Sequence, residues 1–121
     1  MGGVVVIFEY QLRPEVDVEE YSQLSQRLRA RVAADERFGF VDMHSVVADD
    51  GTHTVVERFN SAARMHNWAT DPEHRAAQRR GREEFYAWYR VTVSDVGREY
   101  SYGSVPEVIT AGASSPPPAG Q

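Results

Sequence analysis

The amino-acid sequence predicts an α+β fold of the ferredoxin-like type, with the element order βαββαβ. Three observations predict it: an alternating apolar segment before a capped helical repeat, two strand segments around an Asp-Gly pair, and a second helical region before a last strand. In this arrangement a four-stranded antiparallel sheet carries its helices on one face only.

The first strand and the first helix are expected over residues 4–12 and from residue 18 onward. Asp17 and Glu20 form a capping-box pattern that begins the helix. Apolar residues recur in the helix at helical spacing, at Tyr21, Leu24, Leu28 and Val32. The alternation of the strand places these residues on the face that packs against the helix: Val4, Val6, Phe8, Tyr10 and Leu12.

A β-hairpin is expected next, with strands over residues 39–48 and 53–59. The Asp50-Gly51 pair between them is typical of a two-residue turn. If these two residues form the loop, His44 lies opposite Glu57 on the neighbouring strand.

The second half of the chain predicts two consecutive helices and a last strand. Asn60 or Ser61 can cap a helix over residues 61–69, and Thr70 with Glu73 repeats the capping-box pattern. The second of these helices is expected to continue past Gly81 to Tyr89, and the last strand to cover residues 90–102. Helical spacing then gathers these residues on one inward face: His74, Ala77, Gly81, Phe85 and Trp88, with Gln78 beside them.

The domain organisation follows from length and composition. The 121 residues suffice for one domain, which we place at residues 1–103. Residues 104–121 are expected to form a C-terminal arm and a Pro-rich disordered tail, with Val105 to Ile109 as a possible arm onto a partner subunit. Because helices cover only one face of the sheet, alternating apolar residues on the other face predict a homodimer.

Composition excludes several functions. The chain has no cysteine, so it can form neither a disulfide nor a thiolate metal site. Its net charge of −5 disfavours binding to nucleic acid. The N-terminal segment lacks the features of a signal peptide or a membrane span, which favours a cytoplasmic protein with no membrane partner.

Three residues of the second helical region carry alternative interpretations. Trp68 can belong to the core, or it can form a flat apolar wall for an aromatic ligand. His74 can be satisfied by a backbone carbonyl, or it can serve as a proton acceptor or metal ligand. Gly81 costs about 1 kcal/mol relative to alanine inside a helix, which indicates close approach to the sheet or to a ligand.

Outside this region, candidate chemistry is sparse. The expected His44–Glu57 pair could orient an imidazole as a general base, or it could be a structural pair on the sheet. The four histidines lack the spacing of a trihistidine metal site, and no phosphate-binding loop or GxSxG motif occurs.

The motifs of the chain resemble those of the antibiotic biosynthesis monooxygenase family, whose members form dimeric α+β barrels. The resemblance rests on VVVIFEYQLRPE, GFVDMHSV and the run NSAARMHNWATDPEHRAAQRRGREEFYAWYRVTVSDVGREY, in this order along the chain. The most specific part extends from Trp68 to Tyr89, and it is followed by Arg98 and Tyr100.

The resemblance implies candidate functions for individual residues. In the cofactor-free oxygenases of the family, Asn and Trp side chains orient a substrate whose phenolate reacts with O2, which points to Asn67 and Trp68. The groups that could deprotonate the substrate or support its anion are His44, His74 and Arg58. Gln78 stands where the haem-degrading members have their iron ligand, and Tyr10 stands in place of their first-strand asparagine. The expected substrate-binding residues are Tyr10, Arg58, Gln78, Gly81 and Phe85.

These observations lead to one expectation and two alternatives. The expected function is O2-dependent monooxygenation of a small aromatic or phenolic intermediate of secondary metabolism, without a cofactor. A haem protein that uses His74 and a non-catalytic protein that binds a small ligand remain the alternatives.

Overall fold

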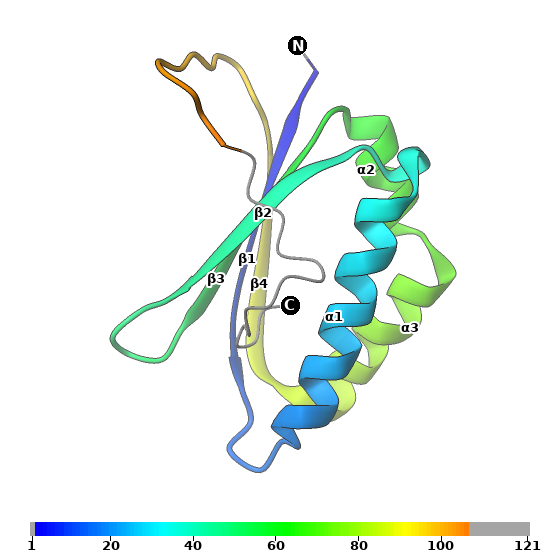
Figure 1. The fold of residues 1–121 in the computed structure, drawn as a ribbon. Coiled ribbons are helices and arrows are strands. Elements are labelled where there is room, and N and C mark those ends of the chain that lie inside the picture. Colours follow the sequence, from blue (N-terminus) through cyan, green and yellow to red (C-terminus); the bar gives the residue numbers. More distant parts are fainter. Residues whose placement is uncertain (1, 107–121) are drawn as a thin grey trace.

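The computed structural model of the protein describes residues 2–106. Four strands form one antiparallel sheet in the order β2-β3-β1-β4 (Figure 1). The strands are β1 (Val4–Leu12), β2 (Phe40–Val47), β3 (His53–Phe59) and β4 (Tyr86–Asp95). With the helices between them, they give the βαββαβ order of the ferredoxin-like fold, as the sequence predicts.

The helices lie together on one side of the sheet, as Figure 1 shows. They are α1 (Val18–Ala34), α2 (Ala62–Ala69) and α3 (Pro72–Arg80), with a short 3-10 turn at Glu36–Phe38. The helix N-termini are capped by Asp17, Ser61 and Asp71, whose side chains each accept a backbone N–H three residues later. The cap of α3 is therefore Asp71 and not Thr70, one residue later than the sequence pattern indicated.

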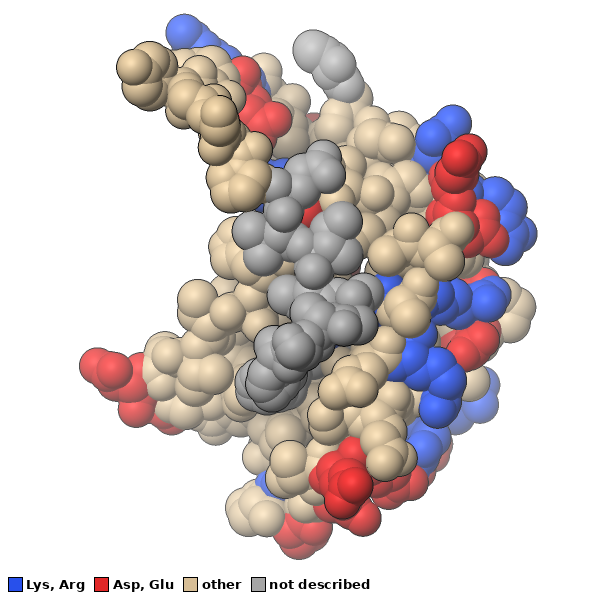
Figure 2. Space-filling model, in the orientation of Figure 1, with Lys and Arg blue, Asp and Glu red and all other residues tan. Residues whose placement is uncertain are grey.

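Figure 2 shows charged side chains of both signs gathered on the helical side of the molecule.

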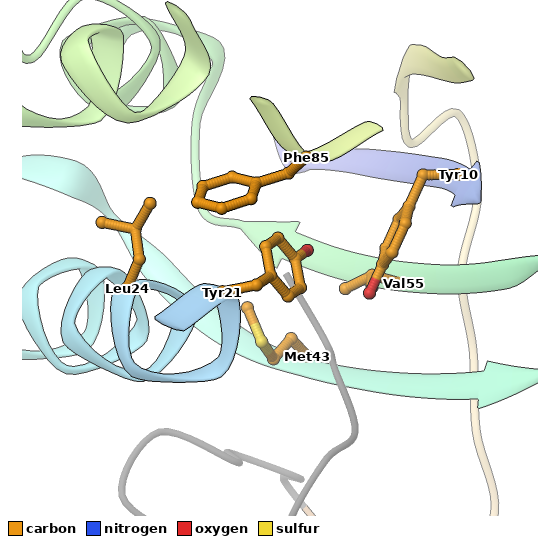
Figure 3. Packing of buried hydrophobic residues seen from close by; sticks show 6 residues of the cluster. All are labelled: Tyr10, Tyr21, Leu24, Met43, Val55 and Phe85. Carbon is orange, nitrogen blue, oxygen red and sulfur yellow. The ribbon is translucent and has the colours of Figure 1, made fainter. Parts of the chain in front are cut away.

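The core lies between α1 and the sheet. The predicted inward face of β1 is confirmed at Val4, Val6 and Tyr10, which are all buried. In one of the two core clusters, Tyr21 and Leu24 extend from α1 toward Phe85 and the strand residues (Figure 3). The other cluster contains Trp68 and Phe38, whose rings meet edge to face with centroids 4.9 Å apart.

The end of α3 differs from the sequence prediction. The α-helix ends at Arg80, and a single π-helical turn (η2, Gly81–Phe85) leads directly into β4 at Tyr86. Trp88 and Tyr89 are consequently strand residues, and β4 covers residues 86–95 instead of 90–102.

Arg13, in the loop after β1, accounts for this early end. Its guanidinium donates to the backbone carbonyls of Arg82, Glu83 and Tyr86 at 2.8, 2.9 and 3.1 Å. Its backbone N–H donates to the carbonyl of Phe85 at 2.8 Å. These contacts satisfy carbonyls that a continuing helix would pair internally.

The hairpin register also differs from the prediction. The loop is closed by hydrogen bonds from the Ala48 N–H to the Thr52 carbonyl and from the Gly51 N–H to the Ala48 carbonyl. His44 therefore pairs with Val56, and Glu57 pairs with Met43. Because side chains alternate between faces, this one-residue shift places His44 and Glu57 on opposite sides of the sheet.

The face of the sheet away from the helices is mixed in character. Val5 and Ile7 lie on it, beside exposed apolar side chains such as Trp88, which is 41% exposed. Two ion pairs interrupt the apolar surface, with Arg90 2.7 Å from Glu9 and Arg58 3.1 Å from Asp42.

Most of the expected arm and all of the Pro-rich tail lie outside the described residues.

Candidate active site

A cavity of about 180 Å³ lies between the sheet and the three helices. Its floor comes from β1, β3 and β4, and its walls come from α1, the α2–α3 region and the π-helical turn. Seven aromatic side chains contribute to its lining: Phe8, Tyr21, Phe59, Trp68, Phe85, Tyr86 and Tyr89. Such a surface suits a small, flat, apolar molecule.

The cavity reaches the surface along β4, the edge strand. On its helix-facing side, Tyr89, Val91 and Val93 line the cavity and remain 38%, 49% and 51% exposed. Phe8 and Val6, their neighbours on β1, form the deeper part of the floor. A ligand could thus enter past β4 without movement of the helices.

Trp68 and His74 form one wall of the cavity. Their rings are stacked with centroids 4.1 Å apart and planes 13° from parallel. The Nδ1 atom of His74 lies 3.0 Å from the Trp68 carbonyl. A carbonyl only accepts hydrogen bonds, so we assign the proton to Nδ1, which leaves Nε2 as the acceptor. Burial lowers the pKa of His74, opposed in part by the Trp68 carbonyl and Asp71, and favours this neutral form.

Asp71 holds this wall in place from the junction of α2 and α3. Its carboxylate accepts the His74 N–H at 3.1 Å and two hydrogen bonds from Arg31 of α1, at 2.7 and 3.0 Å. The bonds from Arg31 lower the pKa of the Asp71 carboxyl. The ion pair therefore fixes the start of α3, and with it His74, to α1.

Glu57 brings a carboxyl group to the cavity floor. Its residue is only 8% exposed, and burial raises the pKa of Glu57 to about 7, with the charge of Arg29 on α1 opposing the rise. Sequence reasoning considered Glu57 only as a partner of His44 and missed this position. The sequence contains a sign of this position, because Glu57 interrupts the apolar alternation of Val55 and Phe59 on the inward face of β3.

Tyr21 and Tyr86 share a hydrogen bond at the other end of the cavity, with their hydroxyl oxygens 2.9 Å apart. Burial raises the pKa of both hydroxyl groups, so both remain neutral at physiological pH. These phenols can donate or accept hydrogen bonds, but they do not act as bases near neutral pH.

Comparison with known proteins identifies the family. The family model described as "Antibiotic biosynthesis monooxygenase" matches residues 3–80, which include the first three strands, α1, α2 and α3. The chain belongs to the antibiotic biosynthesis monooxygenase family. A Bacillus subtilis (strain 168) relative, "Uncharacterized protein YqjZ", is 33% identical over 79 residues, which are 65% of this chain and 68% of that protein.

Solved structures show the same fold at lower identity. Rv0793 from Mycobacterium tuberculosis matches with a TM-score of 0.68 and 20% identity, over 82% of this chain and 99% of that one. SnoaB, a cofactor-independent oxygenase from Streptomyces nogalater, matches with a TM-score of 0.62 and 12% identity, over 88% of this chain and all of that one. At these identities the likeness establishes the fold of the family and not a shared substrate.

Four of the residues that sequence reasoning selected converge on the cavity: Trp68, His74, Gln78 and Phe85. Two others lie behind its wall. Tyr10 is fully buried in the core, with its ring 6.1 Å from that of Tyr21. A side-chain carbon at Gly81 would overlap the ring of Tyr86, so the glycine serves close packing within the protein.

Three further candidates lie elsewhere, which corrects their assignment to the pocket. His44 and Arg58 are on the sheet face away from the helices, where Arg58 pairs with Asp42. Asn67 is exposed on α2, and its amide donates to the Arg37 carbonyl at 2.9 Å. The shifted hairpin explains the position of His44, and the family's Asn role does not transfer to an outward-facing Asn67.

Within residues 2–106, no cluster of three or more His, Asp or Glu side chains has the arrangement of a metal site. None of the helices in this part of the chain is long and apolar enough to cross a membrane.

Proposed function

We propose that the protein is an O2-dependent monooxygenase that oxidises a small phenolic molecule in the cavity between the sheet and the helices. The observation that carries this proposal is the composition of the cavity. Its lining is largely aromatic, and it contains two groups that can accept a proton near neutral pH, His74 and Glu57. Membership of the antibiotic biosynthesis monooxygenase family supports the reaction class.

The proposed reaction balances without an added reductant. A phenol with hydrogen at its para carbon becomes a para-quinone, and one oxygen atom of O2 enters the ring. The other oxygen leaves as water with the hydroxyl hydrogen and the para hydrogen. All four electrons come from the substrate, so the protein has only to bind the phenol, promote loss of its proton and exclude water. We therefore propose that no organic cofactor takes part.

The size of the cavity favours a compact substrate. Sites for drug-sized ligands have volumes of about 300–1,000 Å³, whereas this cavity has about 180 Å³. A porphyrin exceeds such a space, and the His74 ring is stacked flat on Trp68. We infer that the residues present do not fit haem, and purified protein is expected to lack a Soret band.

Oxygen uptake with purified protein tests the reaction. The substrates are 1-naphthol and anthranol, and the expected result is one O2 consumed per quinone formed. With ¹⁸O2, one labelled atom should appear in the quinone and one in water. Binding of both phenols without oxygen uptake would instead favour a non-catalytic ligand-binding protein of the same family.

Trp68 provides the matched variants for this assay. Trp68→Ala removes the flat wall behind the ligand and should weaken both binding and turnover. Trp68→Phe keeps an aromatic face and should retain most of the binding. Equal binding by wild type and Trp68→Ala would place the ligand outside the cavity.

We also propose a homodimer formed through the sheet face that the helices leave uncovered. Exposed apolar side chains on this face, Trp88 and Val46 at 41% and 58%, support a partner surface there. Sedimentation equilibrium should show a dimer at micromolar concentration, and Trp88→Glu should weaken it. A monomer at that concentration in the wild-type protein would overturn the proposal.

A further inference from the structure

We propose that Glu57, rather than His74, accepts the hydroxyl proton of the phenol and so forms the electron-rich anion that reacts with O2. This inference rests on the proposed function, because it assigns a catalytic residue within the same cavity. The carboxylate takes the proton and becomes a neutral carboxylic acid, while the oxygen of the phenol keeps the electron pair of the broken O–H bond.

The position of Glu57 in the fold supports this assignment. Residue 57 lies in β3, an inner strand of the sheet, with Val6 of β1 and Met43 of β2 as its neighbours. Both neighbours are buried apolar residues, so water has little access to the carboxyl group. The side chain lines the cavity, where a bound phenol can reach it.

The number of charges that the proton transfer creates in the cavity favours a carboxylate over an imidazole as the base. Transfer of a proton from a neutral phenol to a carboxylate moves one negative charge but creates no new charge. Transfer to the neutral His74 would create a cation and an anion together in a cavity lined by apolar side chains. Separation of charge is costly where water is excluded, so the carboxylate route has the smaller electrostatic penalty.

The protein also places a positively charged side chain where it stabilises the carboxylate form of Glu57 before the proton transfer. Arg29 of α1 is 4% exposed, and its charge favours the ionised form of Glu57. Arg29 is outside the cavity lining, so it acts through Glu57 as a positioning residue. The other titratable groups that line the cavity are Tyr21, His74, Tyr86 and Tyr89.

The titration properties of the two candidate bases agree with this choice. Burial raises the pKa of Glu57 to about 7 and lowers the pKa of His74 below its ordinary value of 6.5. A phenol such as tyrosine has a pKa of about 10. The stronger base of the two is thus Glu57, and its pKa lies closer to that of the substrate.

The turnover test compares Glu57→Gln with His74→Gln, using 1-naphthol and the exposed first-turn variant Glu19→Gln as the control. In wild type, kcat/KM should rise with pH through an apparent pKa of about 7. Glu57→Gln should lose this rise and should lower kcat by about 10²- to 10⁴-fold with little change in KM. His74→Gln should keep the rise, and Glu19→Gln should match wild type. If His74→Gln loses the rise and Glu57→Gln keeps it, the proposal is overturned.

A binding test without oxygen separates this inference from the proposed function. The probe is 4-nitrophenol, whose anion is yellow, titrated anaerobically near pH 7 with the absorbance of the free, partly ionised ligand subtracted. Wild type should bind it with a visible fraction of the anion, and Glu57→Gln should bind it in the neutral form. Ionisation by wild type without turnover of any phenol would overturn the proposed function alone. The same anion fraction in Glu57→Gln would overturn the role of Glu57, and failure of wild type to bind any phenol would overturn both.

Discussion

Two buried carboxyl groups in this protein, Glu57 and Asp71, have pKa values that are shifted in opposite directions. Their exposed fractions are similar, 8% and 6%, but Glu57 lies deeper among protein atoms than Asp71. Arg31 donates two hydrogen bonds to Asp71 and keeps its pKa below the usual range. The charge of Arg29 opposes the effect of burial on Glu57, whose pKa nevertheless rises to about 7.

The comparison shows that depth and hydrogen-bond partners together set the direction of the pKa shift of a carboxyl group with little exposed surface. Asp71 is committed to three hydrogen bonds that hold α3 against α1. Glu57 faces a cavity and can exchange a proton near neutral pH. Three predictions test this difference, beginning with the largest effect.

The largest expected effect is the dependence of stability on the ionisation of Glu57. The pKa of this group is about 7 in the folded protein and about 4.5 in the unfolded chain. Its stabilising contribution is therefore complete below about pH 4.5 and is lost as pH rises through about 7. At about 1.4 kcal/mol for each pKa unit, the loss amounts to about 3 kcal/mol.

Denaturant unfolding of wild type and Glu57→Gln at low and at neutral-to-alkaline pH measures this effect. Relative to wild type, the glutamine variant should gain about 3 kcal/mol in free energy of unfolding between about pH 4 and about pH 8. Other titrating groups contribute equally to both proteins and cancel. A difference that does not change with pH would mean that Glu57 has the same pKa in the folded protein as in the unfolded chain, and a change of the opposite sign would mean that it is paired like Asp71.

A smaller loss is expected when Asp71 is replaced. Asp71→Ala removes both the N-cap of α3 and the partner of Arg31, and it should lower the free energy of unfolding by about 2 kcal/mol at neutral pH. Asp71→Asn keeps a good capping residue and should lose less. Because the pKa of Asp71 is lowered in the folded state, its contribution is present above the ordinary value of 3.8 and is lost as pH falls through the folded value.

Thermal unfolding of wild type and both Asp71 variants at neutral and acidic pH checks this prediction. Relative to wild type, Asp71→Asn should gain stability on acidification, whereas Glu57→Gln should lose it. A deficit of Asp71→Asn that grows on acidification would contradict the assigned direction.

The smallest effect concerns His74, whose backbone N–H is bound by Asp71. The negative charge of Asp71 raises the pKa of His74 against the larger effect of burial. Asp71→Asn should therefore move the pKa of His74 further down, as measured by NMR titration of the carbon-bound imidazole protons. Thr70→Ala, at the exposed neighbouring residue, is the control and should leave this titration unchanged. An upward shift in Asp71→Asn would show that the two groups are not coupled in this way.

Much of the fold followed from local patterns. Alternation in β1 predicted the buried Val4, Val6 and Tyr10, and helical spacing predicted the buried Tyr21 and Leu24 of α1. These predictions succeeded because a strand or helix exposes each face at a fixed period, whatever it packs against. Local patterns also brought Trp68 and His74 toward one wall, since both follow from the inward faces of neighbouring helices.

The sequence by itself thus determined the order of the elements, the inward faces of β1 and α1 and the aromatic character of the cavity, whereas Trp88, predicted to face inward, lies on the outer face of the sheet. Only the tertiary structure decided where α3 ends and which hairpin residues face each other. Arg13 is remote in sequence from the carbonyls of the π-helical turn that it binds, so no local pattern contains this contact. The register of the β2–β3 hairpin depends on the conformation of its loop, and it differs by one residue from the predicted register. This shift places His44 on the outer face of the sheet and leaves Glu57 on the face that lines the cavity.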